Sequence, residues 1–520
     1  MKIDMEKRYL ILPVSQYAVR KKLIFRQAGR PVYDVECRIT PYGKEYMYLD
    51  MREYRGMTLE LEIEPEISYP PQMTDIPPER AESAFRPAVH FTAGRGWIND
   101  PNGLVYYEGL YHLFFQYNPA DTVWGNMHWG HAVSRDLIHW EEKETALFPD
   151  SMGTMFSGCA VVDEKNLTGL QENAHLPLLL YYTAAGGTSQ TSAGAPFTQC
   201  LAYSTDGGVT FRKYEKNPVL PHIRASNRDP KLVYVEEEGC YYMVLYLSEN
   251  DFAFFRTEDL LTFTKTQEYT LPGSSECPDL FPLHTAKGEK YWILIGACGR
   301  YAVGRFVNGQ FVTDGKVRRL HYGNGRLYAA QSYFGMPEGR RVRLCWITAP
   351  IPDSAFNGAM SLPEELTLRE REGEVLLCAQ PAKEMACLYA GRSAHPAQQV
   401  GAGETLTLPL CGKAQEIRLS YEAGTGGRIT LSLLGLQLVL DAAANEICVR
   451  EERLPLAVRD GRVTLRLITD THALELYAGE GEVHGCVSHP ADYSLPAVSL
   501  CAEKETVLSC FEVCALSPVF

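Results

Sequence analysis

Three acidic residues stand at corresponding points of a repeated sequence pattern, each beside a proline motif. Asp100 and Asp229 directly precede prolines, and Glu276 begins the run Glu276-Cys277-Pro278. Proline removes a ladder hydrogen bond from a strand, so these motifs are expected at strand mouths that face a cavity. One such pair alone is more often a turn former, whereas three acids in register favour a shared catalytic site.

Carboxyl groups around one cavity suit glycoside hydrolysis. One carboxylate attacks the anomeric carbon and a second carboxyl group protonates the leaving oxygen, and a retaining pair lies about 5–5.5 Å apart. Crowding is expected to raise the pKa of one member, which then acts as the acid.

The acids correspond because the chain repeats a unit of strand, glycine-containing turn and aromatic strand. The units begin at Asp100, Asp229 and Cys277, and their spacing from proline to tyrosine is 10, 11 and 13 residues (101 to 111, 230 to 241, 278 to 291). Turns of related sequence follow at residues 134–140, 204–211 and 257–263. Units of roughly 55–60 residues predict a five-bladed β-propeller over residues 86–372, and its innermost strands would carry the acids to the axis.

The flanking segments are also predicted to be β structure, which makes the whole chain all-β. Residues 1–66 contain alternating strand-like runs and are predicted to form a small β-rich N-terminal domain. Residues 67–85 are rich in proline and read as a linker or wrapping loop. Residues 373–520 carry short strand-like runs between glycine-rich turns, which predicts a C-terminal β-sandwich.

Composition restricts the partners. The net charge of −14 and the pI near 5.5 exclude nucleic acid and anionic membranes as expected partners, and a neutral small-molecule carbohydrate fits the balance. The 15 cysteines form no C-x-x-C pair, and the N-terminus carries no signal-like segment, so a cytoplasmic location is expected. No metal or cofactor motif is present, so no metal and no cofactor are expected. The sequence is compatible with a homo-oligomer and leaves the oligomeric state open.

Four ordered motifs resemble the signature set of glycoside hydrolase family 32, which includes invertases, levanases and inulinases. They are Trp97-Ile-Asn-Asp-Pro-Asn-Gly103, Phe156-Ser-Gly158, Arg228-Asp-Pro230 and Glu276-Cys-Pro-Asp-Leu-Phe281. The similarity extends through Phe115–Pro119, Trp124–Asn126 and Tyr328–Gln331 and covers roughly residues 86–372.

The resemblance implies a role for each acid. Asp100 would be the nucleophile, Glu276 the general acid/base, and Asp229, with Arg228 beside it, would hold ring hydroxyls. The implied fructose subsite is lined by Asn99, Gln116, Trp124, Phe156 and Ser157. The implied reaction is retaining release of terminal fructose from β-D-fructofuranosides: fructo-oligosaccharides, inulin- or levan-type fructans, or sucrose.

Three alternatives remain. A fructosyltransferase would use the same covalent intermediate, a non-catalytic carbohydrate-binding propeller would lack the acids, and an inverting furanosidase would lack the Trp97–Gly103 motif. A segment that contacts the leaving sugar in plant-type members reads here His321-Tyr-Gly-Asn324, and this departure weakens the case for sucrose.

Overall fold

The regular secondary structure of the described residues consists almost wholly of strands, which confirms the all-β prediction. The computed structural model describes residues 1–424 and 427–519, and within these residues no helix is long and apolar enough to cross a membrane. The helical turns are short 3-10 helices: η1 (Arg52–Tyr54), η2 (Glu236–Glu238), η3 (Pro337–Gly339) and η4 (Lys383–Leu388).

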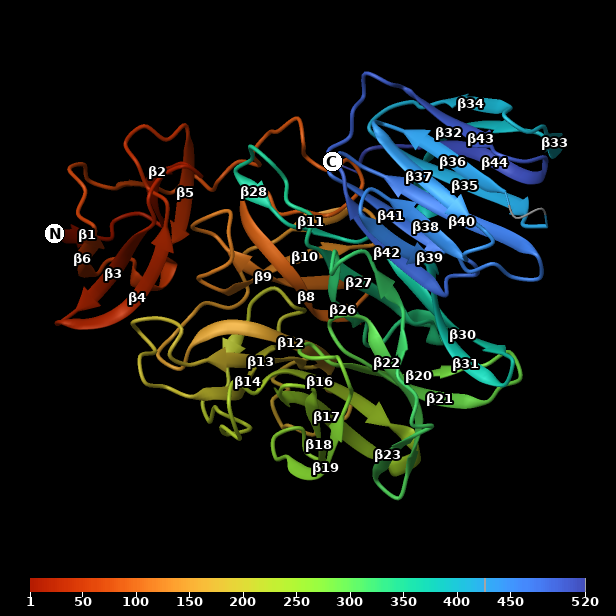
Figure 1. Cartoon of the computed structure of the whole chain (residues 1–520). Helices are drawn as coiled ribbons and strands as arrows, with labels where there is room; N and C mark the ends of the chain where they lie inside the picture. Colours follow the sequence, from red (N-terminus) through yellow and green to blue (C-terminus); the bar gives the residue numbers. More distant parts are fainter. Residues whose placement is uncertain (425–426, 520) are drawn as a thin grey trace.

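Two small sheets, here called the N-terminal sheets, open the chain (Figure 1). One has the order β1 (Lys2–Asp4), β6 (Thr58–Glu64), β3 (Lys21–Gln27), β4 (Arg30–Cys37), and the other β5 (Glu45–Asp50), β2 (Tyr9–Val14), β7 (Gln72–Thr74). The sequence of β6 alternates buried and exposed residues, because one face packs on a core and the other meets solvent. Strand β7 comes from the stretch predicted as a linker.

Five sheets, the central sheets, follow in chain order; their strands pair antiparallel except for β28, which pairs parallel with β8. The first joins β11 (Trp140–Glu142), β10 (His128–Ser134), β9 (Leu110–Asn118), β8 (Gly96–Tyr107) and β28 (Phe356–Asn357). The second joins β12 (Thr154–Val162), β13 (Leu178–Ala185), β14 (Phe197–Ser204) and β15 (Arg212–Lys213). The third joins β16 (Arg228–Val235), β17 (Cys240–Ser248), β18 (Asp251–Thr257) and β19 (Thr264–Thr270).

The fourth central sheet joins β20 (Asp279–His284), β21 (Lys290–Ile295), β22 (Arg300–Val307) and β23 (Gln310–Thr313), with β24 (Arg318–Arg319) on β22. The fifth joins β26 (Leu327–Ser332), β27 (Val342–Ile347), β30 (Glu364–Arg371) and β31 (Glu374–Pro381), with β29 (Ala359–Met360) on β27. The boundary predicted at residue 372 falls in the turn between β30 and β31, inside this sheet.

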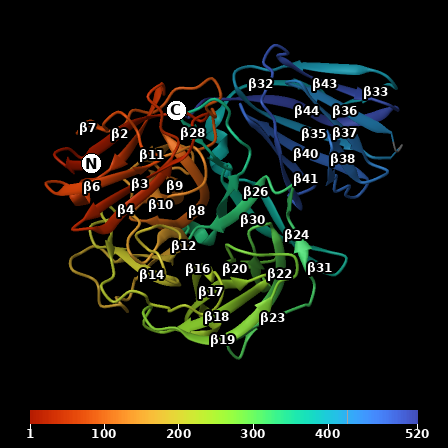
Figure 2. The same cartoon turned by 60° about the vertical axis from the view of Figure 1, so that its left-hand side comes forward.

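The first strands of the central sheets contact one another in a closed order: β8 with β12, β12 with β16, β16 with β20, β20 with β26, and β26 with β8. Interior strands such as β13 are buried along their whole length, which explains their continuous apolar sequence. Three of these first strands, β8, β16 and β20, carry or directly follow the acidic motifs. The motifs are therefore brought together at the centre of the five sheets (Figure 2).

Two further sheets, the C-terminal sheets, face each other across a leucine- and valine-rich core. One contains β25 (His321–Tyr322), β42 (Val483–Ser488), β41 (Ala473–Ala478), β40 (Arg462–Thr469), β35 (Ala414–Glu422), β44 (Thr506–Leu516), β32 (Tyr389–His395) and β33 (Gln398–Val400). The other contains β34 (Thr405–Pro409), β43 (Ala497–Ala502), β36 (Arg428–Leu433), β37 (Leu436–Asp441), β38 (Glu446–Val449) and β39 (Glu452–Pro455).

A buried charge network joins the central and C-terminal sheets. His90 Nδ1 lies 2.8 Å from Asp470 Oδ2, and His90 Nε2 lies 2.7 Å from Glu475 Oε1. Glu475 also pairs with His484 at 3.0 Å, and all these side chains are fully buried. Burial alone would lower the pKa of His90, but the two carboxylates outweigh it and raise that pKa to about 9.

Because of this network, the stability of the fold should decrease at alkaline pH. A raised pKa means that the contribution of His90 is fully present below its ordinary pKa of about 6.5 and is lost as pH rises through about 9. Glu475→Gln should lower stability by about 3–5 kcal/mol, because it leaves a buried charge short of a partner, and should shift the alkaline loss to lower pH. Thermal unfolding from pH 6 to 10 measures both effects. Glu422→Gln, on an exposed site of β35, is the control, and parallel pH profiles for Glu475→Gln and wild type would contradict the assignment.

Candidate active site

The acids sit where their strands are irregular. The pairing of β8 with β9 shifts register between Ile98 and Pro101, and that of β16 with β17 shifts between Arg228 and Lys231. Asp100 and Asp229 therefore lie in β-bulges, where the following prolines remove no regular ladder bond. Asp229, the second residue of β16, lies at the strand mouth that its motif predicted, whereas Asp100 is the fifth residue of β8, where the bulge interrupts the ladder inside the strand. A bulge also turns its side chains out of the ladder.

Residues at two of the three acidic motifs also have a strained, left-handed backbone conformation. Asp229 has φ of 66°, and Glu276 and Cys277, just before β20, have φ of 56° and 38°. Left-handed backbone at non-glycine residues costs of order 1–3 kcal/mol each and persists where the surroundings hold it, often at functional sites. Here the left-handed backbone sets the direction of two of the three acidic side chains, those of Asp229 and Glu276.

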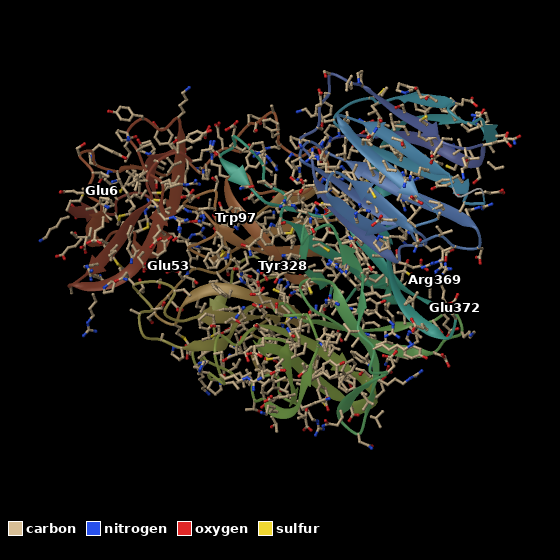
Figure 3. All side chains as sticks on the ribbon, in the orientation of Figure 1. Glu6, Glu53, Trp97, Tyr328, Arg369 and Glu372 are labelled. Atoms are coloured by element: carbon tan, nitrogen blue, oxygen red, sulfur yellow. The ribbon has the colours of Figure 1, made fainter. Side chains whose placement is uncertain are left out.

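Hydrogen bonds fix the carboxyl group of Asp100. Ser157 Oγ donates to Asp100 Oδ2 at 2.6 Å, and Asn99 Nδ2 donates to Oδ1 at 3.0 Å. The Trp97 indole N–H donates in turn to the Asn99 side-chain oxygen at 3.0 Å. Trp97 and Tyr328 both lie near the middle of the molecule (Figure 3), and each ring contacts that of Trp346.

Cys277 connects two of the acids. Its sulfur lies 3.5 Å from Oδ2 of both Asp100 and Asp229, and its backbone N–H donates to Asp229 Oδ2 at 3.0 Å. Burial and the neighbouring carboxylates raise the pKa of the Cys277 thiol well above its usual range. The group is thus a neutral donor between two carboxyl groups and no nucleophile.

Glu276 is held by two other side chains. Arg228 Nη2 donates to Glu276 Oε1 at 2.5 Å, and the Tyr328 hydroxyl donates to Oε2. Arg228 also lies 3.7 Å from Asp229 Oδ2 and stacks over the Tyr246 ring. The Glu276 side chain is 31% exposed and that of Asp229 is 5% exposed, so Glu276 alone of this pair reaches toward solvent.

The pKa values of both aspartates are raised. Burial raises the pKa of Asp100, the charge of Glu276 adds to the effect, and the bonds from Ser157 and Asn99 oppose it. Burial also raises the pKa of Asp229 to about 7, against the opposing charge of Arg228. The sequence led us to expect that crowding would raise the pKa of one acid, whereas here burial is the largest cause of the rise in both aspartates.

The predicted subsite residues connect to this cluster directly or through neighbouring residues. Asn99, Ser157 and Arg228 bond the acids directly. Trp124 and Phe156 contact each other edge to face at 5.9 Å between ring centroids, and Trp124 is 51% exposed. Gln116 is buried, and its side chain donates to the backbone oxygen of Met155 at 2.8 Å, so it supports the strand that carries Phe156.

Sequence reasoning assigned no role to Tyr328 or Cys277, although both lie in quoted motifs. The available signal was the place of Cys277 next to Glu276 and of Tyr328 at the start of the motif Tyr328–Gln331. The run His321–Asn324 departs from the plant-type segment that contacts the leaving sugar, and here His321 is 2% exposed, lies 3.8 Å from the sulfur of Cys345 and packs on His484. Its strand β25 pairs with β42, which turns the side chain into the contact with the C-terminal sheets.

An all-β protein that gathers Asp100, Asp229 and Glu276 in one hydrogen-bonded cluster supplies the pair of carboxyl groups that glycoside hydrolysis needs. Residues 90–381 match the family described as glycosyl hydrolases family 32 N-terminal domain. The chain is 32% identical over 456 residues to a levanase of Bacillus subtilis, covering 76% of this chain and 65% of the levanase. It is 31% identical over 352 residues to an extracellular exo-inulinase of Aspergillus awamori, covering 58% of this chain and 65% of that relative.

The crystal structure of exo-inulinase from Aspergillus awamori superposes with a TM-score of 0.76 at 24% identity, covering 84% of this chain and 99% of that one. The chain belongs to glycosyl hydrolase family 32. It spans somewhat less than two thirds of the length of the two curated relatives.

Proposed function

We propose that the protein is a retaining β-fructofuranosidase that releases terminal fructose from fructo-oligosaccharides and from inulin- or levan-type fructans. The observation that carries this proposal is the convergence of Asp100, Asp229 and Glu276, each with its own set of hydrogen-bond donors. The names of the levanase and exo-inulinase relatives support fructans as the substrate class.

In this mechanism Asp100 attacks C2 of the terminal fructosyl unit, forming a carbon–oxygen bond as the glycosidic bond breaks. The donors Ser157 and Asn99 favour the ionised form against burial and keep one carboxylate orientation. They also leave Asp100 fixed before substrate arrives, so little reorganisation is needed.

Glu276 gives its proton to the leaving oxygen and then takes a proton from the water that releases fructose. Its partial exposure fits contact with both the leaving chain and water. Arg228 and Tyr328 orient the carboxyl group, and burial together with the neighbouring Glu276 raises the pKa of the Tyr328 hydroxyl, so that it remains a donor.

Asp229 is the most enclosed acid, and we assign to it the binding of ring hydroxyls, where bonds that strengthen in the transition state accelerate the reaction. Trp124 and Phe156 form an apolar wall for the ring, and Gln116 supports that wall from the strand behind it.

We also infer that the five central sheets are the blades of a β-propeller and that the C-terminal sheets form a β-sandwich. The closed order of contacts among β8, β12, β16, β20 and β26 supports five blades. Acids at the inner ends of such strands would meet in a pocket closed at one end. Such a pocket accepts a chain end, which is the basis for exo-action.

The products from a five-unit fructo-oligosaccharide test the proposed function. We expect free fructose from the first time points, with a ladder of products shortened by single units, when the digest is followed by chromatography. Early di- and trisaccharides without fructose would contradict exo-action. Products longer than the substrate as the main outcome would instead identify a fructosyltransferase.

The pH dependence of kcat/KM should report Asp229. Because its pKa is raised to about 7, activity that needs its carboxylate should fall as pH drops below about 7. Arg228→Gln removes the charge that opposes this shift, so the acidic limb should move up by about one pH unit or more. Arg224→Gln, which breaks the ion pair between Arg224, in the segment before β16, and Asp251 of β18, is the matched control. An acidic limb at the same pH in both variants would refute the assignment.

A further inference from the structure

One loop of the candidate site is held by the N-terminal sheets. Residues 119–127, here called the rim loop, join β9 to β10 and carry Trp124, whose ring contacts Phe156 beside Ser157. The family match begins at residue 90, so the N-terminal sheets lie outside it. Figure 2 shows these sheets beside β9 and β10.

The N-terminal sheets contact the rim loop at several points, and the first contact is the ion pair between Arg38, just after β4, and Asp121 of the rim loop. Arg38 Nε lies 3.0 and 3.1 Å from the two Asp121 oxygens, and Nη2 lies 2.5 Å from Oδ1. Arg38 also donates its backbone N–H to Asp121 and its Nη2 to Thr122 Oγ1. The Asp121 side chain is only 6% exposed, so the pair is shielded from solvent and geometrically specific.

A second contact fixes the other end of the rim loop. Asn126 accepts from the backbone N–H of Glu36 and donates to the Glu36 carbonyl, both at 2.8 Å, as a strand neighbour would. Asn126 holds a φ of 49°, a left-handed conformation that asparagine tolerates well.

The rim loop is also anchored by packing. Ala120 is buried within the hydrophobic core of the N-terminal sheets, and the Tyr33 hydroxyl lies 3.2 Å from Nε2 of His128, where β10 begins. Trp124 thus sits in a segment held at both ends and from beneath, while its own ring is half exposed.

A neighbouring loop is tied down in the same way. Asp34 of β4 accepts from the backbone N–H groups of Gln190 and Thr191 at 3.0 and 2.9 Å. These residues lie in the connection between β13 and β14, and Phe197 at the start of β14 packs on Phe156. Both aromatic residues of the proposed sugar wall therefore adjoin segments that the N-terminal sheets hold.

We propose that the N-terminal sheets form an intramolecular clamp that positions Trp124 for binding the terminal fructosyl unit. Arg38 is a positioning residue: it touches no substrate and acts through Asp121 on the rim loop. The clamp rests on the proposed function, since it assigns Trp124 to the substrate wall. Without it, the rim loop would sample other conformations, and only part of the population would bind substrate.

A double-mutant cycle tests the clamp in the full chain. Arg38→Ala should raise KM for a short fructo-oligosaccharide about threefold to tenfold with kcat nearly unchanged, because binding weakens while the acids stay in place. In a Trp124→Ala background the same Arg38→Ala change should have little further effect, because the side chain through which it acts is gone. Arg26→Ala, which breaks the exposed pair with Glu62 inside the N-terminal sheets, is the control and should leave KM unchanged.

Hydrogen exchange read by mass spectrometry gives a result that does not depend on activity. Arg38→Ala should increase exchange in the peptide covering 119–127 about tenfold or more, while peptides of β20 and β21 keep wild-type rates. Unchanged exchange in 119–127 overturns the clamp. An equal rise in KM with and without Trp124 overturns the assignment of Trp124 as its target. Wild-type protein that releases no fructose refutes the proposed function and leaves the exchange test valid.

Discussion

The charge of three carboxyl groups gathered in one buried site is the constraint on which the rest of the structure depends. Burial in a poorly solvated place raises the pKa of a carboxyl group, and like charges at short range add to that cost. The protein offsets it with directed donors: Ser157 and Asn99 on Asp100, the Cys277 N–H on Asp229, and Arg228 on Glu276. The residual shift of Asp229 to a pKa of about 7 shows that the compensation is incomplete.

These donors come from three of the central sheets and from the turn just before a fourth, so the site exists only while the sheets keep their relative positions. Bulges in β8, β12 and β16 turn the side chains toward one place, and the closed order of first strands holds the bulges together. The buried network around His90 joins the C-terminal sheets to the same body. The N-terminal sheets act further out, on the loops that carry the apolar wall.

Much of this arrangement was predictable from the sequence, because proline and repeat spacing constrain the backbone locally. Asp-Pro motifs in repeat register indicated strand mouths. Asp229, the second residue of β16, lies at such a point, whereas Asp100 is the fifth residue of β8 and lies in a bulge inside the strand. The role of Cys277 as a donor between two carboxyl groups was not predictable, since it depends on where another sheet places Asp100. The position of His321 was not predictable for a related reason: strand β25 pairs with β42, about 160 residues later, and no local pattern indicates that partner. The ties from Arg38 and Asp34 to the central sheets are likewise long-range contacts.

Trapping the covalent intermediate tests the central claim most directly. In Glu276→Gln, a β-fructofuranoside with an activated leaving group should still react with Asp100, because such a group needs no proton, whereas release by water loses its general base. Mass spectrometry of the quenched protein should show a gain of one fructosyl unit, and fragmentation should locate it on the peptide that contains Asp100. A fructosyl adduct on Asp229, or turnover without any adduct and with inversion at the anomeric carbon, would contradict the account.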